Sequence, residues 1–200
     1  MAVKNNEQGS IMIETILYIC VLIALGTIIA QGASRVFARY NLGRTAQQVI
    51  DLKKTILMYT AADEDYTALS NNNLKQANAI PLDMKNFTHA LGGQITIGCA
   101  KDYHDAKENA VANKYMYFIT FDQLDRSSCT EILSQGQFFT EGSELDTLIV
   151  NSKVWGYEFS LFAFNGARPI NPIHKQHLSV EQSFYACDKK KNNTITWIFS

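Results

Sequence analysis

The 200-residue sequence lacks the features that mark several common protein classes. It has only three prolines, and with 11% aromatic residues this composition excludes an extended disordered chain. Its net charge is −1, so it lacks the strongly basic surface that non-specific binding to nucleic acid requires. Four cysteines are too few for a small disulfide scaffold, and no CxxC pair is present to hold zinc. We therefore expect one domain of ordinary size, without a nucleic-acid partner.

Signatures of catalysis are also missing. The sequence contains no P-loop, no GxGxxG, no GxSxG and no HExxH. His174 and His177 are three residues apart, a spacing that suits a metal on a helix, but Pro169 and Pro172 predict a loop there. We therefore expect no enzyme activity, no cofactor and no metal site.

The sequence does contain a long apolar run near its N-terminus. Ile11 to Ala30 carries one charge, Glu14, and twenty helical residues span about 30 Å, the thickness of a bilayer core. A secretory signal peptide would explain the run, with the small residues after it as a cleavage site. A plain membrane anchor would also explain it, although a carboxylate in a membrane helix costs roughly 2.5–3.5 kcal/mol at the centre. By the positive-inside rule, the side that follows the run would be cytoplasmic, because it carries Arg35, Arg39 and Arg44.

The residues around Glu14 favour a third interpretation. Gly9-Ser10-Ile11-Met12-Ile13-Glu14 resembles the processing site of type IV prepilins. In that family a peptidase cuts after the glycine, the new N-terminus is methylated, and a glutamate occupies the fifth mature position. Cleavage after Gly9 would make Ser10 the first residue and Glu14 the fifth. The resemblance therefore implies that residues 1–9 are a leader peptide.

Cleavage would also give Glu14 a partner. The new ammonium on Ser10 would lie on the same helical face, four residues away. Glu14 can neutralise that ammonium or the one on a neighbouring subunit, and the resemblance implies the second. A buried carboxylate without a partner is costly, so only one stagger between packed helices would be tolerated. The resemblance implies self-polymerisation, a prepilin peptidase and the pilus assembly machinery as partners, and passage from the bacterial inner membrane to an extracellular pilus.

Beyond the apolar run, the pattern predicts that the same helix continues to about Thr60. Apolar or small residues recur every three or four positions, which indicates one buried face. That predicted face comprises Val36, Tyr40, Gly43, Ala46, Val49 or Ile50, Ile56 or Leu57, and Thr60, with Lys53 as a misfit. We divide the mature chain into residues 10–33, a membrane or filament-core segment, and residues 34–200, a globular domain that includes the second half of the helix.

The sequence pattern of the rest of the chain predicts short strands and helices. Capping-box patterns, in which a serine precedes Glu or Gln by three residues, predict helices at Ser128–Ser134 and Ser179–Cys187, and another is expected at Thr67–Ala77. Period-two and β-branched patterns predict strands at Gln94–Ile97, Tyr115–Phe121, Thr147–Val150, Glu158–Phe164 and Thr194–Phe199. Short or irregular links favour antiparallel pairing. The predicted fold class is α+β, a very long N-terminal helix packed on an antiparallel sheet with short helices.

This order of elements resembles the type IVb pilins, in particular those of conjugative thin pili and related adhesive pili. The matching features are Ile80-Pro81, Gly92-Gly93 before a strand, a short helix bearing Cys129, and Ala186-Cys187 before Asn193-Thr194 and a last strand. The resemblance implies a pilin-like roll and a disulfide between Cys129 and Cys187. It implies a structural subunit for adhesion, conjugative contact or aggregation.

Two alternatives remain open at this point. A minor pilin or a pseudopilin of a type II secretion system would share the N-terminal chemistry. An unprocessed, single-pass, membrane-anchored binding protein would retain its leader and use the sheet domain to hold a ligand.

Overall fold

The computed structural model describes residues 6–84, 86–103, 113–134, 145–151, 153–156, 171–172 and 178–200. Within these ranges it describes the side chains except those of residues 6–12, 154–156 and 171–172. The chain divides into two compact units, Met1–Asn41 and Leu42–Ser200, and one helix contributes residues to both.

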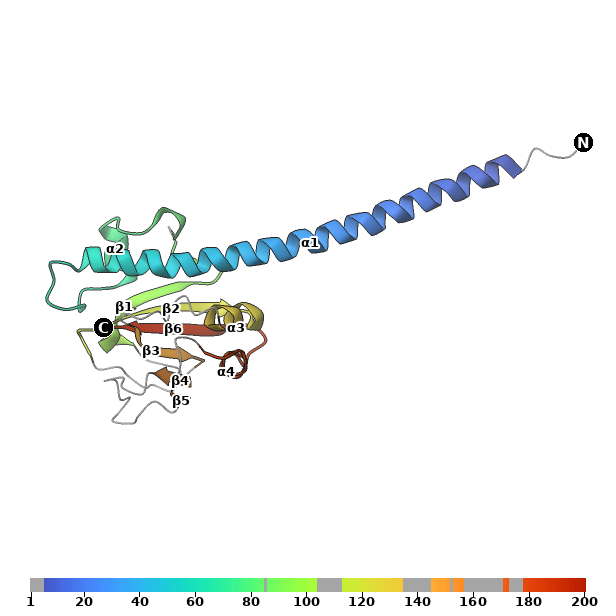
Figure 1. Ribbon diagram of the computed structural model, residues 1–200. Helices are drawn as coiled ribbons and strands as arrows, with labels where there is room; N and C mark the ends of the chain where they lie inside the picture. The colour runs from blue at the N-terminus through green and yellow to red at the C-terminus, as the bar shows by residue number, and fades with distance from the viewer. Residues whose placement is uncertain are drawn as a thin grey trace, which may run out of the picture. The chain divides into compact units, whose positions relative to one another are not determined.

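That helix, α1, spans Asn6–Tyr59 and is 54 residues long (Figure 1). The predicted single helix is confirmed, and it continues because the first proline of the sequence is Pro81. It starts earlier than the expected Ile11, so part of the polar N-terminal segment is helical as well. It ends at the expected place, where the Thr60 hydroxyl donates to the carbonyl of Ile56 at 2.8 Å.

The second unit is built on a six-stranded sheet with the order β1-β2-β6-β3-β4-β5 (Figure 1). Neighbouring strands are antiparallel, as predicted, except that β4 and β5 are parallel. The strands are β1 (Ile95–Cys99), β2 (Tyr117–Leu124), β3 (Leu145–Val150), β4 (Lys153–Gly156), β5 (Asn171–Pro172) and β6 (Asn193–Phe199).

Two of these strands differ from the sequence prediction. Neither β4 nor β5 was expected, and the proline-containing segment read as a loop supplies β5, where Pro172 occupies the sheet edge that proline tolerates. The strand predicted at Glu158–Phe164 lies outside the described residues. The predicted α+β architecture, with a long N-terminal helix, an antiparallel sheet and short helices, is confirmed.

The last strand, β6, lies between β2 and β3. Tyr117 of β2 pairs with Phe199 at one end of β6, and Leu124 pairs with Asn193 at the other. All but one of the seven β6 residues are buried, since a central strand is covered on both faces.

The core of the second unit is formed by the last third of α1 and the sheet. Leu52 and Ile56 of α1 are fully buried in the same cluster as Phe121 and Trp197. The helical face that supplies this cluster is Leu42, Ala46, Val49, Leu52 and Ile56.

The buried face differs in part from the predicted one. Val36 and Tyr40 are 67% and 64% exposed, because the core starts only at Leu42. Leu42 and Leu52 are buried although the predicted stripe omitted them. The misfit Lys53 is half-buried and places its ammonium 5.3 Å from the centre of the Phe199 ring.

Within the described ranges of the unit there are also three short α-helices, together with 3₁₀ turns at Leu82–Met84 and Ala100–Asp102. The helices are α2 (Asn71–Gln76), α3 (Arg126–Ser134) and α4 (Val180–Ala186). The capping box at Ser179 and Gln182 is confirmed. The one predicted at Ser128 is wrong, because Asp125 caps α3 by accepting from the backbone N–H of Ser128 at 2.8 Å. Ser70 caps α2, which therefore begins later than Thr67.

The predicted turn at Gly92-Gly93 holds a buried histidine. His89 Nδ1 accepts from the backbone N–H of Leu91 at 3.3 Å, and its Nε2 lies 2.9 Å from the carbonyl oxygen of Asp122. Since a carbonyl only accepts, the ring is neutral with its proton on Nε2. The ring stacks on Phe121, and a side chain at Gly93 would collide with His89 and the Asp122 carbonyl.

The same turn is attached to α1. The buried Gln48 accepts from the backbone N–H of Ala90 at 2.9 Å and donates to Asp83 at 3.3 Å. If His89 were protonated on Nδ1, its new N–H would face the backbone N–H of Leu91. Two donors repel each other, so protonation would disturb this attachment. Burial lowers the pKa of His89 below the ordinary imidazole value, although nearby Asp122 raises it.

We predict that the free energy of unfolding decreases as the pH falls below about 6.5, by at most about 1.4 kcal/mol per pH unit from this group. The unfolded chain binds a proton there that the folded His89 resists, so acid favours unfolding. Urea titrations between about pH 7.5 and about pH 5 measure this dependence. His89→Asn removes the titrating group and should flatten the slope. Equal slopes for the variant and the unchanged chain would contradict the assignment.

Candidate functional site

The first part of α1 presents a continuous apolar surface. Every side chain from Ile13 to Tyr40 is exposed within the single chain. Among them are Ile16, Leu17, Ile19, Val21, Leu22, Ile23, Leu25, Ile28 and Ile29, which lie on all sides of the helix. A helix that is apolar all round needs lipid or other apolar helices around it.

This helix meets a length and composition test for a membrane span. Within Ile13–Tyr59, an 18-residue window has a mean hydropathy of 2.3 and none of it is buried. A secretory signal sequence near an N-terminus would meet the same test.

Two hydroxyl groups in and after the apolar segment, those of Thr27 and Ser34, are satisfied within the helix. The Thr27 hydroxyl donates to the carbonyl of Ala24 at 2.7 Å, and the Ser34 hydroxyl donates to that of Gln31 at 2.9 Å. Such bonds leave little polar surface to desolvate. Glu14 is the exception, because its exposed carboxylate takes part in no ion pair among the residues with described side chains. It lies among Ile13, Leu17, Tyr18 and Val21.

The predicted processing site lies in the same helix. Gly9 and Ser10 are within the first turns of α1, which begins at Asn6. Glu14 follows Ser10 by four positions in α1, so both positions share one face of the helix, as the spacing predicted. The side chains of residues 6–12 lie outside the description.

The arginines after the apolar segment have different surroundings. Arg35 and Arg39 are exposed. The Nε of Arg44 lies 3.5 Å from the Asp83 carboxylate, in the unit that begins at Leu42. At least one of the three positive charges that favoured a cytoplasmic location therefore has a carboxylate partner within the chain.

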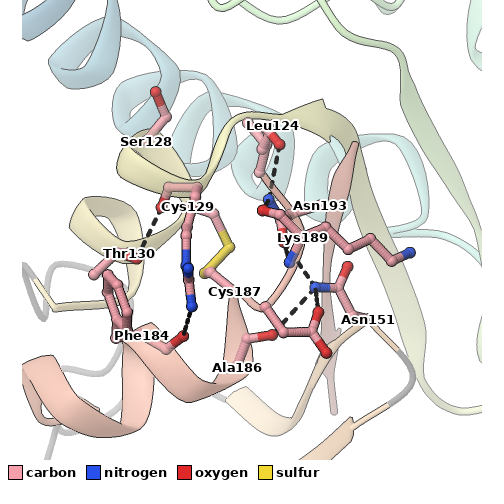
Figure 2. The surroundings of a disulfide bond; sticks show 12 residues. Leu124, Ser128, Cys129, Thr130, Asn151, Phe184, Ala186, Cys187, Lys189 and Asn193 are labelled. Atoms are coloured by element: carbon pink, nitrogen blue, oxygen red, sulfur yellow. Dashed lines mark hydrogen bonds between the residues drawn. A yellow bond between two sulfur atoms is a disulfide. The ribbon is translucent and has the colours of Figure 1, made fainter. Parts of the chain in front are cut away.

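A second region of interest joins α3 to α4. Cys129 and Cys187, the pair that the resemblance implies, form a disulfide, and both are fully buried (Figure 2). Their Cα atoms are 6.0 Å apart across a sequence separation of 58 residues. Cys99 is free and buried, and burial raises the pKa of its thiol.

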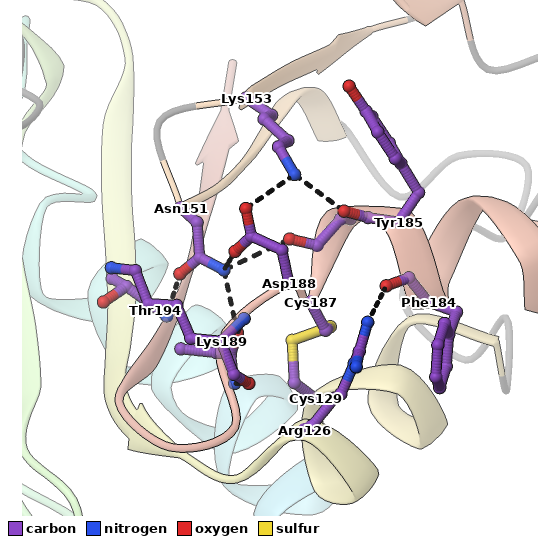
Figure 3. A network of polar contacts seen from close by, with 12 residues as sticks. Arg126, Cys129, Asn151, Lys153, Phe184, Tyr185, Cys187, Asp188, Lys189 and Thr194 are labelled. Carbon is purple, nitrogen blue, oxygen red and sulfur yellow. Dashed lines mark hydrogen bonds and ion pairs between the residues drawn. A yellow bond between two sulfur atoms is a disulfide. The ribbon is translucent and has the colours of Figure 1, made fainter.

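Two asparagines hold the segment after the disulfide. The buried Asn193 donates from Nδ2 to the carbonyls of Leu124, at 3.0 Å, and Lys189, at 2.7 Å. Its Oδ1 accepts from Asn151 at 2.8 Å and from the backbone N–H of Lys189 at 3.1 Å. Asn151 also approaches Asp188 and the carbonyl of Ala186, and it accepts from the backbone N–H of Thr194 (Figure 3). The loop from Cys187 to Asn193 therefore has a defined backbone.

Cations and aromatic rings border this network. Lys153 binds Asp188 at 2.9 Å and the carbonyl of Tyr185 at 2.7 Å (Figure 3). The hydrogen bond from Lys153 lowers the pKa of the Asp188 carboxyl below its ordinary value. The guanidinium of Arg126 lies 3.8 Å from the centre of the Phe184 ring, on the exposed side of α4.

The disulfide pair that the resemblance implies, Cys129 and Cys187, is confirmed, while the role of Glu14 stays a prediction. Asn193 was named only as part of a matching motif, and Asn151 and Lys153 were missed. Asn151 has a φ of 49°, a left-handed backbone conformation that asparagine tolerates. Its position just after a predicted strand was the one local sign in the sequence of such a conformation. The pairing of Asn151 with Asn193 joins positions 42 residues apart and leaves no local pattern.

The candidate metal ligands considered from sequence lie outside the described residues, since 173–177 contain both His174 and His177. Within the described ranges, no group of three histidine, cysteine, aspartate or glutamate side chains is placed to hold a metal.

The sequence and the structure of the chain were compared with those of known proteins. No protein-family model matches the chain, and no curated protein matches it. Among solved structures, the chain is similar to TcpA, a type IV pilin of Vibrio cholerae El Tor, with 14% identity, a TM-score of 0.47, and coverage of 80% of this chain and 99% of TcpA. It is also similar to a type IVb pilin of Salmonella typhi, with 14% identity, a TM-score of 0.44, and coverage of 79% and 96%.

We predict that Cys129→Ser with Cys187→Ser lowers the free energy of unfolding by about 4 kcal/mol, because the 58-residue loop is then unconstrained in the unfolded chain. Urea unfolding of the full chain in detergent, followed by tryptophan fluorescence, to which the buried Trp197 contributes, measures the change. Cys20→Ser is the control, because Cys20 is exposed and free, and its unfolding midpoint should not move. A double variant as stable as the unchanged chain would contradict the prediction.

Proposed function

We propose that the chain is the structural subunit of a type IV pilus of the IVb group. It is made as a membrane-held precursor, cut after Gly9 by a prepilin peptidase, and polymerised through α1. One observation carries this proposal: a single continuous helix is apolar and exposed over Ile13–Ala30 and then supplies the core of a globular unit from Leu42.

The exposed part of α1 suits two successive surroundings. Before assembly, its apolar side chains lie in the inner membrane, whose core matches the length of Ile11–Ala30. After assembly, the same side chains pack against other copies of α1, away from both lipid and water. Thr27 and Ser34 fit both states, because their hydroxyls bond to their own helix.

The carboxylate of Glu14 forms no ion pair within its own subunit among the residues with described side chains. A carboxylate surrounded by apolar helices is costly unless a positive charge reaches it. The ammonium created on Ser10 of a neighbouring subunit provides that charge. Glu14 then fixes the stagger between subunits, since other staggers leave it unpaired.

The remaining parts have matching roles. Residues 1–9 are the leader, residues 10–33 form the membrane and then filament-core segment, and residues 34–200 form the unit on the filament surface. The subunit has a structural role in adhesion, conjugative contact or aggregation, and its partners are further copies of itself and the inner-membrane assembly machinery.

The first test is the N-terminus of the protein purified from its native cells. We expect intact mass and peptide sequencing to show a mature chain that begins at Ser10, with a methylated amine. A chain that begins near Ala33 would instead be a secreted domain, and a retained Met1 would indicate the membrane-anchored binding protein. Either of those two results would refute the proposed processing.

The second test is Glu14→Val in the same cells. We expect the variant to be cut and to remain in the membrane, but to form few or no filaments by electron microscopy, because no charge then fixes the stagger. Thr27→Val is the matched control, since it also replaces a polar residue in the apolar segment but removes no charge. Normal filaments from Glu14→Val would eliminate its role in register.

Filament length and subunit abundance then separate the related alternatives. A major pilin forms long surface filaments in which this chain predominates. A pseudopilin forms short assemblies, and a minor pilin is a trace component of fibres made from another subunit.

A further inference from the structure

Three consecutive lysines occupy the loop between α4 and β6. Lys189, Lys190 and Lys191 are all exposed, and we call them the basic loop. None of them belongs to an ion pair among the described residues. The nearby carboxylates have other partners: Asp188 binds Lys153, and Asp125 caps α3. This surface therefore presents a concentrated positive charge.

The backbone of the basic loop is held in one conformation. Asn193 binds both the N–H and the carbonyl of Lys189, and the carbonyl of Lys190 accepts from the backbone N–H of Arg126 at 3.3 Å. The disulfide lies just before it at Cys187 (Figure 2). A loop fixed in advance loses little conformational entropy when it binds a partner.

An acidic segment follows the end of α1. Asp63 and Glu64 are exposed and belong to no ion pair among the described residues, and we call them the acidic loop. Its position is fixed by the next residues: Asp65 binds Lys114 at 3.1 Å, and Tyr66 donates from its backbone to the Lys114 carbonyl at 2.9 Å. Hydrogen bonds from Thr67 and Lys114 lower the pKa of Asp65 to about 2, so that carboxylate is charged.

The two loops lie at opposite ends of the sheet (Figure 1). The acidic loop is beside Lys114, just before β2, at the end where Tyr117 pairs with Phe199. The basic loop directly precedes Asn193, which pairs with Leu124 at the other end of the same two strands. Seven strand residues separate these ends, or about 20 Å.

We propose that the basic loop of one subunit binds the acidic loop of another. At about 20 Å, the two loops of one chain are beyond the screening length of physiological salt. Two copies related mainly by a translation bring them together. Such a contact uses different surfaces on its two sides, so it does not close into a dimer and continues as an open array.

This inference rests on the proposed filament and adds a contact between globular units to the packing of α1. Exposed ion pairs are individually weak, so this contact guides approach and register more than it holds the subunits together. It also predicts that assembly weakens as salt concentration rises.

A charge exchange tests the contact in cells that assemble the full-length protein. Lys190→Glu with Lys191→Glu should reduce the filament yield by about tenfold, and Asp63→Lys with Glu64→Lys should do the same, because attraction becomes repulsion. All four substitutions in one chain should restore the yield to within about threefold of the unchanged chain. Lys54→Glu with Lys75→Glu is the control, since it makes the same charge change at exposed lysines on α1 and α2 and should have little effect.

The thermal midpoint of each purified variant shows whether it folds, and the restored quadruple variant gives the same information within cells. A cross-linking readout is independent of yield: Glu64→Cys with Lys190→Cys should give a ladder of disulfide-linked subunits in filaments. Normal filaments from both reversal variants, no rescue by the exchange, or no ladder would overturn this contact and leave the proposed function standing. If the unchanged chain formed no filaments and kept its leader, both proposals would fail.

Discussion

The structure depends on the packing of one helical face against one sheet. Leu52 and Ile56 of α1 are fully buried with Phe121 and Trp197, and each such aliphatic side chain stabilises the fold by about 1.5–3 kcal/mol. Neither partner is stable alone, because the sheet would expose an apolar face and the helix an apolar stripe. This packing anchors only the part of α1 from Leu42 onward. Residues 13–40 have no such cover among the described residues, and their apolar surface is therefore explained by surroundings outside the chain.

Polar contacts then determine details that apolar packing leaves open. Gln48 and His89 attach the glycine turn to α1 and to β2, each through bonds to backbone groups. At the same end of the sheet, where Leu124 pairs with Asn193, the buried Asn193 satisfies both its donors and its acceptor. A buried amide with every bond made tolerates only one arrangement of its neighbours. The glycine turn and the loop before β6, which share this end of the sheet, thus both have well-defined backbones.

Local patterns predicted the elements that local chemistry specifies. The absence of proline and the apolar periodicity were enough for α1, and β-branched and aromatic residues were enough for β2 and β6. The cap of α3 was misassigned because Asp125 and Ser128 are both good capping residues and only the geometry decides between them. Local patterns could not predict hydrogen bonds between side chains far apart in the sequence, such as the one between Asn151 and Asn193. Glu14 was singled out by the resemblance of Gly9–Glu14 to a prepilin processing site, and its role stays a prediction because its proposed partner belongs to another molecule.

The central place of β6 has a consequence for how the chain folds. It is the final strand in the sequence, yet β2 and β3 bind to its two sides and do not pair with each other. Among the described strands, no pairing other than that of β6 joins β1 and β2 to β3, β4 and β5, so without residues 193–199 these strands form two separate groups. The core beneath α1 also lacks Trp197 without them. Folding of this unit therefore requires residues 193–199, and a chain truncated before Asn193 has no complete sheet to offer for assembly.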